Sequence, residues 1–213
     1  MKRGILIAAG GSGQRFGADK LLAQFRGQPV LIHSLRCCTA VVAPKDCVLV
    51  APAAALESYR QLLDTHGFSE LRLVAGGSER AHSVVNGLRA LDCDLVAVHD
   101  AARPLLRPDT LRLCFEQAEK TGSAVLAHPV TDTIKIVDAD NRVLSTPPRA
   151  SLRAAETPQI FPLAALLAAY QKALDQGVLP TDEAMAMELA GHPVHLVLHQ
   201  DDNRKITYLR DLE

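Results

Sequence analysis

Residues 4–20 read GILIAAGGSGQRFGADK, an apolar run that passes directly into a glycine-rich loop. The run Gly4–Ala9 is aliphatic at successive positions, as in a β-strand that is buried on both faces. Four glycines in the loop let backbone N–H groups approach a ligand closely, and Arg15 and Lys20 add positive charge. A buried strand that ends in such a loop predicts an α/β sheet with a polyphosphate site at its edge, rather than a plain flexible turn.

The same strand pattern recurs along the chain. Similar apolar runs are Cys47–Ala51, Leu71–Ala75, Leu95–His99 and Ser123–His128. Amphipathic stretches between them are Val30–Val42, Ala55–His66, Ala81–Leu91 and Asp109–Thr121. Later segments suggest a helix near Leu163–Leu174, a capped helix after Thr181-Asp182-Glu183 and a strand over Val194–Leu198. This alternation predicts a doubly wound, mostly parallel sheet with helices on both faces, a Rossmann-like α/β fold.

The alternation stops at Thr131. The segments Thr133–Val137 and Arg142–Leu144, with a polar turn between them, predict a β-hairpin. A hairpin of this size has no core of its own and must lean on something else. Two interpretations stay open, a flap at the edge of the sheet or an arm that docks on a second subunit. We therefore expect one domain over residues 1–213, with a protruding arm at about 131–157.

Composition excludes several classes of function. Lys plus Arg number 23 against 24 Asp plus Glu, a formal net charge of −1, so the basic excess of a nucleic-acid binder is missing. Five cysteines without a C-x-x-C pair suit a reduced compartment. The chain has no apolar run long enough for a membrane span, and its start lacks the pattern of a signal peptide. We expect a soluble cytoplasmic protein without nucleic-acid or membrane partners.

Three further loops follow expected strands, where open α/β sheets bind ligands. Gly76–Ser78 and then Ser83 suit either a base or ribose site, or only a turn and a helix cap. Asp100 suits Mg²⁺ held mainly by phosphate oxygens, or an ion pair with Arg103, and the neighbouring phosphate loop favours the metal. Lys205 lies at the same edge if the last strand is parallel, and otherwise in a solvated loop.

The usual phosphate motifs fit the first loop poorly. It lacks the Gly-Lys-Ser/Thr of a P-loop, and the pattern Gly11-x-Gly13 meets Phe16 where a dinucleotide fingerprint needs glycine. An NAD-binding oxidoreductase would also need an acidic residue at the end of the second strand to bind the ribose. That strand ends instead in Ala51-Pro52. That class remains a weaker alternative.

Several motifs in fixed order carry a resemblance over essentially the whole chain. They are Ala8-Ala9-Gly10…Arg15…Lys20, Gly76-Gly77…Arg80…Ser83, His99-Asp100-Ala101-Ala102-Arg103-Pro104, Asp132-Thr133, Arg149, Thr157-Pro158-Gln159, Thr181-Asp182-Glu183-Ala184 and Asp202-Asn203-x-Lys205-x-Thr207. Together they resemble the 2-C-methyl-D-erythritol 4-phosphate cytidylyltransferase family of the non-mevalonate isoprenoid pathway. The fourth-strand run and the closing motif are far more specific than the glycine loop.

The resemblance implies a Rossmann-like nucleotidyltransferase that uses CTP and a sugar-alcohol phosphate, releases pyrophosphate, and needs Mg²⁺ or another divalent cation. It implies catalytic roles for Arg15, Lys20, Arg149 and Lys205, with Asp100 as the metal ligand. It implies nucleotide binding by Ala8, Ala9, Gly10, Gly11, Ser12, Gly13, Gly77, Ser78 and Ser83. It implies substrate binding by Arg103, Thr133 and Thr181. Members form homodimers through the arm, so that some contacts come from the partner subunit.

Two features separate this chain from the family pattern or from its neighbours. Asp19 precedes Lys20 where the family usually has proline, and the spacing from Arg15 to Lys20 is shorter than usual. Ala102 favours a methylerythritol enzyme over a ribitol 5-phosphate cytidylyltransferase, which more often carries valine there. The ribitol enzyme and a non-catalytic nucleotide-binding protein remain alternatives. Seven histidines have no ligand-like spacing and are interpreted as surface or core residues: His33, His66, His82, His128, His192, His195 and His199.

Overall fold

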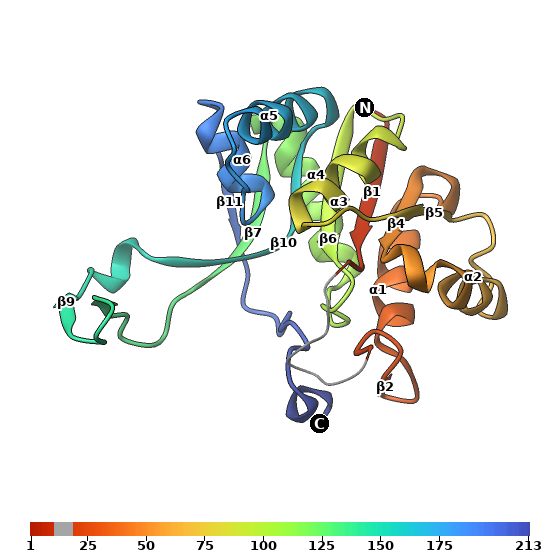
Figure 1. Cartoon of the computed structure of the whole chain (residues 1–213), viewed down its shortest axis with the longest axis horizontal. Coiled ribbons are helices and arrows are strands. Elements are labelled where there is room, and N and C mark those ends of the chain that lie inside the picture. The colour runs from red at the N-terminus through yellow and green to blue at the C-terminus, as the bar shows by residue number, and fades with distance from the viewer. Residues whose placement is uncertain (11–18) are drawn as a thin grey trace.

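A seven-stranded sheet in the order β11-β7-β10-β6-β1-β4-β5 forms the centre of the protein (Figure 1). The computed structural model describes residues 1–10 and 19–213. The strands of the sheet are β1 Arg3–Ala8, β4 Cys47–Ala51, β5 Arg72–Ala75, β6 Leu95–Asp100, β7 Ala124–Pro129, β10 Arg153–Pro162 and β11 Leu196–Leu198. Pairing is parallel except on both sides of β10, which is antiparallel to β6 and β7.

Helices cover both faces of this sheet. They are α1 Val30–Thr39, α2 Leu56–Thr65, α3 Arg80–Arg89, α4 Pro108–Thr121, α5 Leu163–Asp175 and α6 Glu183–Leu189. Side chains of α1, α2 and α4 share one buried core with Ile5 and Ile7 of β1. Those of α3, α5 and α6 share a second core with Leu6. Because alternate residues of one strand feed two cores, the continuous apolar run of β1 has a direct structural reason. The predicted doubly wound fold is confirmed.

Helix α3 lies unusually close to the sheet. A Cβ atom on Gly87 would stand 2.5 Å from both Leu6 Cδ1 and Val50 Cγ2, far inside contact distance. Only glycine therefore permits this approach of α3 to β1 and β4. The close packing brings the first turn of α3 beside the carboxyl ends of these strands.

Strand β10 is the strand of the central sheet that the sequence did not indicate. It carries Pro158, and proline within a run argues against a central strand because it cannot donate to the ladder. The structure accommodates it with a shift of register against β7 between Ala155 and Gln159. Residues 156–161 are buried in the sheet. The last residues of the expected arm, up to 157, therefore belong to β10.

The predicted hairpin is present and leaves the body of the protein as a long arm between β7 and β10 (Figure 1). Its strands are short, β8 Ile136–Val137 and β9 Val143–Ser145. The carboxylate of Asp138 accepts hydrogen bonds from the backbone N–H groups of Asp140 and Arg142 at 2.9 Å, which closes the turn.

The remaining elements are short. They are β2 Gln24–Phe25, β3 Gln28–Pro29, and the 3₁₀ turns η1 Pro44–Asp46, η2 Ala53–Ala55, η3 Arg149–Ser151 and η4 Leu209–Leu212. Among the helices of the described residues, none has the length and apolar character that crossing a membrane requires.

Candidate active site

A pocket opens at the carboxyl ends of β1, β4 and β6. Its lining comes from three strand ends, the start of α3 and the C-terminal segment. The lining residues are Leu6, Ala8, Ala9, Gly10, Lys20, Leu21, Val50, Arg80, Ser83, Val84, Asp100, Ala102 and Lys205. This is the edge at which doubly wound sheets bind their ligands, so the topology and the pocket agree.

Small residues form the wall of the pocket beside β1. The N–H of Ala9 donates to the carbonyl of Val50 at 2.8 Å, which continues the sheet to the rim. A Cβ atom on Gly10 would stand 3.4 Å from Ser83 Oγ, and one on Gly76 only 2.8 Å from it. Ser83 in turn accepts from the N–H of Gly77 at 3.0 Å. The hydroxyl of Ser83 thus holds the glycine turn and forms part of the pocket wall.

Asp100 sits at the mouth of β6 within a ring of cations. Its Oδ2 accepts from Lys205 Nζ at 2.7 Å, while Arg80 and Arg103 approach the carboxylate to 3.8 and 3.9 Å. Burial works against ionisation of this carboxyl, but Lys205, Arg80 and Arg103 together outweigh it and lower the pKa of Asp100 to about 2. Asp100 is therefore an anion among three positive groups, of which Arg80 and Lys205 line the pocket.

Arg80 is held in place from behind by a fully buried carboxylate. Its guanidinium donates to Glu183 Oε1 at 2.9 Å and Oε2 at 3.2 Å, and Tyr170 donates to the same carboxylate at 2.9 Å. Burial alone would lower the pKa of Arg80, and Glu183 outweighs it, so the pKa is raised and the charge is fixed. The planar guanidinium is thereby held with its Nη2 atom 3.8 Å from Asp100 Oδ1.

Glu183→Gln should lower kcat/KM about tenfold or more, because Arg80 loses the charged pair that fixes its orientation at the pocket. The measurement is the steady-state rate of the pyrophosphate release that the resemblance implies, with KM for the expected nucleotide determined separately. Glu188→Gln, at an exposed position of the same helix, is the matched control. Unchanged kinetics of Glu183→Gln, with the melting temperature alone lowered, would reduce Glu183 to a packing residue.

Asp100 is oriented through a buried hydrogen-bond chain. Thr157 Oγ1 accepts from the N–H of Asp100 at 3.0 Å and contacts His99 Nδ1 at 3.1 Å, while His99 Nε2 contacts the carbonyl of Arg103 at 3.2 Å. A carbonyl can only accept, so Nε2 carries the proton and Thr157 donates to Nδ1. Burial, with a smaller contribution from Arg103, lowers the pKa of His99 to about 4 although Asp100 opposes this.

The neutral His99 gives a prediction for acid stability. Below pH 6.5 the unfolded chain binds a proton at this histidine, whereas the folded protein does not until about pH 4. The folded state is therefore progressively disfavoured as the pH falls through this window, by about 3 kcal/mol in total. The stability that the low pKa of Asp100 contributes to the folded state is lost at lower pH, between pH 3.8 and about pH 2. Urea unfolding measures the free energy of unfolding of the wild type and of His99→Gln at each pH. Between pH 6.5 and 4 this free energy should fall more steeply in the wild type. Parallel pH dependence in the two proteins would refute the prediction.

Lys20, which directly follows Asp19, lines the pocket. Its Nζ donates to the carbonyl of Ile206 at 2.8 Å, beside Lys205. The unusual Asp19 anchors this end of the loop, since its carboxylate accepts from the N–H of Leu21 at 3.0 Å and from the hydroxyl of Tyr59 at 2.8 Å. These two hydrogen bonds hold Asp19 in place directly before Lys20.

The other expected site residues divide into three groups. Gly11, Ser12, Gly13 and Arg15 lie outside the described residues. Gly77, Ser78 and Arg103 stand next to the pocket without lining it, and Arg103 donates to the carbonyl of Asn203 at 2.7 Å. Thr133, Arg149 and Thr181 are exposed and away from the lining, the first two on the arm. One chain thus gathers Lys20, Asp100 and Lys205 but not the arm residues.

Arg80 is the pocket residue that the sequence interpretation left without a role. It stands three residues after Gly77 in a motif already singled out, and Glu183 stands in another. The signal was therefore present in the sequence. What the sequence lacked was the pairing of the two motifs across the second core.

The fold and the cation-lined pocket define a nucleotidyltransferase. A family model described as 2-C-methyl-D-erythritol 4-phosphate cytidylyltransferase matches residues 4–213. The chain belongs to this family. Membership excludes the NAD-binding oxidoreductase that the glycine loop alone left open.

Individual relatives agree over the full length. The 2-C-methyl-D-erythritol 4-phosphate cytidylyltransferase of Bacillus velezensis is 40% identical over 213 residues, which cover 98% of this chain and 91% of that protein. The enzyme of the same name from Halalkalibacterium halodurans is 40% identical, and the aligned residues cover 100% of this chain and 94% of that protein. Among solved structures, 4-diphosphocytidyl-2C-methyl-D-erythritol synthase from Anaerococcus prevotii superposes with a TM-score of 0.86 at 28% identity, covering 99% of this chain and 94% of that one.

Proposed function

We propose that this protein transfers the cytidylyl group of CTP to 2-C-methyl-D-erythritol 4-phosphate, giving 4-diphosphocytidyl-2-C-methyl-D-erythritol and pyrophosphate in isoprenoid precursor synthesis. The observation that carries the proposal is one pocket lined by Lys20, Arg80, Lys205 and Asp100, in which Lys205 and Arg80 stand 2.7 and 3.8 Å from the carboxylate. Relatives with the same full-length pattern bear the name of this activity.

The pocket supplies what this reaction needs. A phosphate monoester is already nucleophilic, so its attack on the α-phosphorus of CTP requires no general base. Two highly charged anions must instead be brought together, and the charge of the crowded α-phosphate must be neutralised as pyrophosphate leaves. Fixed cations in a partly enclosed site do this, because they need no reorganisation during the reaction.

A divalent cation fits the donor set at Asp100. This carboxylate is the only acidic side chain among the described residues that line the pocket, and its low pKa keeps it ionised. Mg²⁺ binds through one or two carboxylates together with phosphate oxygens, so Asp100 would hold it with the triphosphate supplying the remaining ligands. When bound, the ion neutralises phosphate charge and orients the triphosphate.

Each expected residue has a distinct task in this proposal. Lys20 and Arg15 stabilise the charge that develops on the triphosphate. Lys205 leaves its pair with Asp100 to position the incoming phosphate, and Arg103 stands beside the same carboxylate. Backbone N–H groups of the segment Ala8–Gly13, with Gly77, Ser78 and Ser83, bind cytosine and ribose. Thr133, Arg149 and Thr181 contact the sugar-alcohol phosphate.

The arm supports a homodimer. Its large apolar side chains are exposed by 41% to 65% of their surface, and the hairpin has no core of its own. These side chains are Ile134, Ile136, Val137, Val143 and Leu144. A second copy of the chain would cover them and would bring Thr133 and Arg149 to the partner's pocket, where their expected roles lie.

Mixed dimers test the exchange of arms. Lys20→Ala and Arg149→Ala should each impair the enzyme when present in both chains of a dimer. A mixed dimer joins one chain of each variant. If Arg149 acts across the interface, both changes then fall in one of its two sites and the other site is intact. Equal mixing should therefore restore about a quarter of wild-type activity, since half of the dimers are mixed and each has one intact site. Activity of the mixture that stays at the level of the separate variants, after verified subunit exchange, would assign Arg149 to the site of its own chain.

The activity itself is tested by pyrophosphate release. The four nucleoside triphosphates are crossed with 2-C-methyl-D-erythritol 4-phosphate and ribitol 5-phosphate, with and without Mg²⁺. We expect release only with CTP, methylerythritol phosphate and metal together. Preference for ribitol 5-phosphate would change the substrate and keep the site, and no release in any combination would contradict the enzyme assignment.

A further inference from the structure

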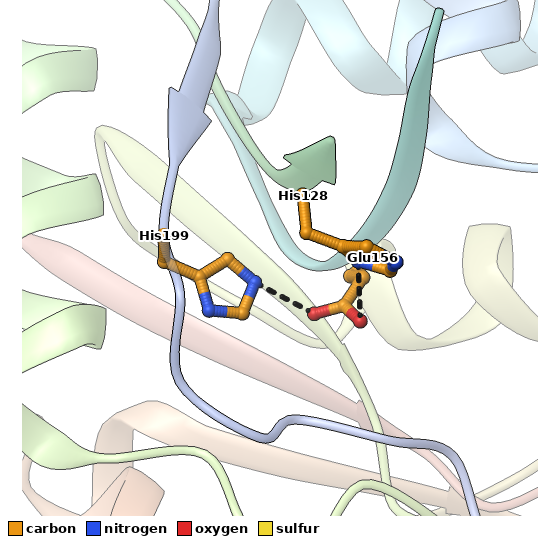
Figure 2. A group of neighbouring side chains, drawn as sticks. All are labelled: His128, Glu156 and His199. Carbon is orange, nitrogen blue, oxygen red and sulfur yellow. Dashed lines mark hydrogen bonds and ion pairs between the residues drawn. The ribbon is translucent and has the colours of Figure 1, made fainter. Parts of the chain in front are cut away.

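Two histidines and a carboxylate from three different parts of the sheet meet at the root of the arm (Figure 2). His128 lies near the end of β7, Glu156 lies in β10, and His199 directly follows β11. Glu156 Oε1 is 3.1 Å from His128 Nδ1, and Glu156 Oε2 is 3.0 Å from His199 Nε2. All three side chains offer their ligand atoms within 4.8 Å of one another.

The ligand atoms of the three side chains lie close enough together to reach one ion. With zinc–ligand bonds of about 2.0–2.1 Å, neighbouring ligand atoms of a tetrahedron stand about 3.3 Å apart. His128 Nδ1 and His199 Nε2 stand 3.1 and 3.0 Å from the two different oxygens of Glu156, and the ligand atoms of the three side chains all lie within 4.8 Å of one another. A bound ion would replace the hydrogen bond between His199 and Glu156 and the ion-pair contact between His128 and Glu156, with side-chain movements that bring both imidazole nitrogens to the same ion.

Burial and neighbouring side chains hold this cluster in place. The side chains of Glu156 and His199 are only 7% and 6% exposed. Asn203 Nδ2 donates to Glu156 Oε2 at 2.7 Å, and Arg103 Nη1 stands 3.3 Å from Oε1, so the carboxylate is oriented by neighbours as metal-binding carboxylates usually are. His128 is 45% exposed and leaves a route from solvent to the cluster.

We propose that His128, Glu156 and His199 form a binding site for a borderline transition-metal ion, with Zn²⁺ the best match. Two imidazoles and one carboxylate are a zinc donor set that leaves a fourth position for water. Mg²⁺ prefers oxygen ligands and six-fold coordination, so this site differs in chemistry from Asp100. The ion would clamp β7, β10 and the segment after β11 where the arm leaves the body.

The sequence pointed away from this site. The histidines lack ligand-like spacing and were expected at the surface or in the core, yet His128 and His199 share one carboxylate. Their positions lie 71 residues apart and converge only because β7 pairs with β11 on one side and β10 on the other. Glu156 gave no signal because β10 itself was not foreseen.

Zinc titration of the metal-free homogeneous protein, without nucleotide, tests the proposal by calorimetry. We expect one Zn²⁺ per chain, and binding at least about 100-fold weaker in His128→Ala and in His199→Ala, each of which removes a ligand. His192→Ala, at an exposed position, and Asp100→Asn should bind zinc as the wild type does. Equal affinity in wild type and both ligand variants, or no stoichiometric binding, would overturn the proposal.

Two further readouts separate ligation from folding. Zinc should raise the melting temperature of the wild type and of His192→Ala but not that of His128→Ala, whose half-exposed position tolerates truncation. Co²⁺ in place of zinc should give the intense visible absorption of a four-coordinate ion. The weak absorption of a six-coordinate ion, or an equal thermal shift in His128→Ala, would contradict a tetrahedral site at these residues.

Discussion

Lys20→Ala should lower kcat by about two orders of magnitude, as the loss of one preorganised transition-state donor does. The lysine lines the pocket and lies beside Lys205, whose neighbour Ile206 accepts its hydrogen bond at 2.8 Å. Its positive charge would stabilise the triphosphate most when the α-phosphate is crowded, so the effect should fall on kcat more than on KM. Steady-state pyrophosphate release at saturating substrates measures it.

The control for this substitution is Lys45→Ala, which removes an exposed lysine on η1, before β4. Its turnover should equal that of the wild type. The melting temperature of Lys20→Ala shows whether the lost bond to Ile206 matters for folding. Near wild-type turnover in Lys20→Ala would mean that the shortened loop has transferred the role to another cation.

Asp100→Asn should lower kcat by about three orders of magnitude, the larger of the two effects. Asparagine keeps the shape of the side chain but offers no charge to a divalent cation, and it leaves Lys205, Arg80 and Arg103 without their shared anion. The rate of pyrophosphate release is measured against Mg²⁺ concentration. We expect the variant to lose the metal response of the wild type.

Nucleotide affinity separates the two contributions of Asp100. Without metal, CTP should bind Asp100→Asn at least as tightly as the wild type, because the pocket becomes more positive. Asp92→Asn, at an exposed position shortly before the same strand, is the matched control and should keep both rate and metal response. A wild-type dependence on Mg²⁺ in Asp100→Asn would move the metal to other ligands.

The fold could be predicted because its signals are local. Runs such as Cys47–Ala51 are aliphatic on both faces, and they alternate with amphipathic helices at the spacing of parallel crossovers. Strand β10 was not predicted, because the interactions that define it are with strands distant in the sequence. Pro158 argues against a strand, because proline cannot donate a hydrogen bond to a neighbouring strand. The segment is a strand only because it pairs with β6 on one side and β7 on the other.

The site was predictable to the extent that residues follow strands. Asp100 and Lys205 were expected at one edge, and the structure joins them at 2.7 Å. The link from Arg80 to Glu183 spans 103 residues and crosses from α3 to α6, which no spacing rule reaches. Thr133 and Arg149 stay outside the pocket of their own chain, so their roles rest on the proposed dimer.

The most direct test of the proposed reaction uses methylerythritol phosphate labelled with ¹⁸O in its phosphate oxygens, together with CTP and Mg²⁺. Attack of that phosphate on the α-phosphorus of CTP keeps every labelled oxygen in the diphosphate of the product. Mass spectrometry and ³¹P NMR should therefore find a cytidine diphosphate ester that carries the whole label, and unlabelled pyrophosphate. Label in the pyrophosphate, or no joined product, would contradict cytidylyl transfer by this site.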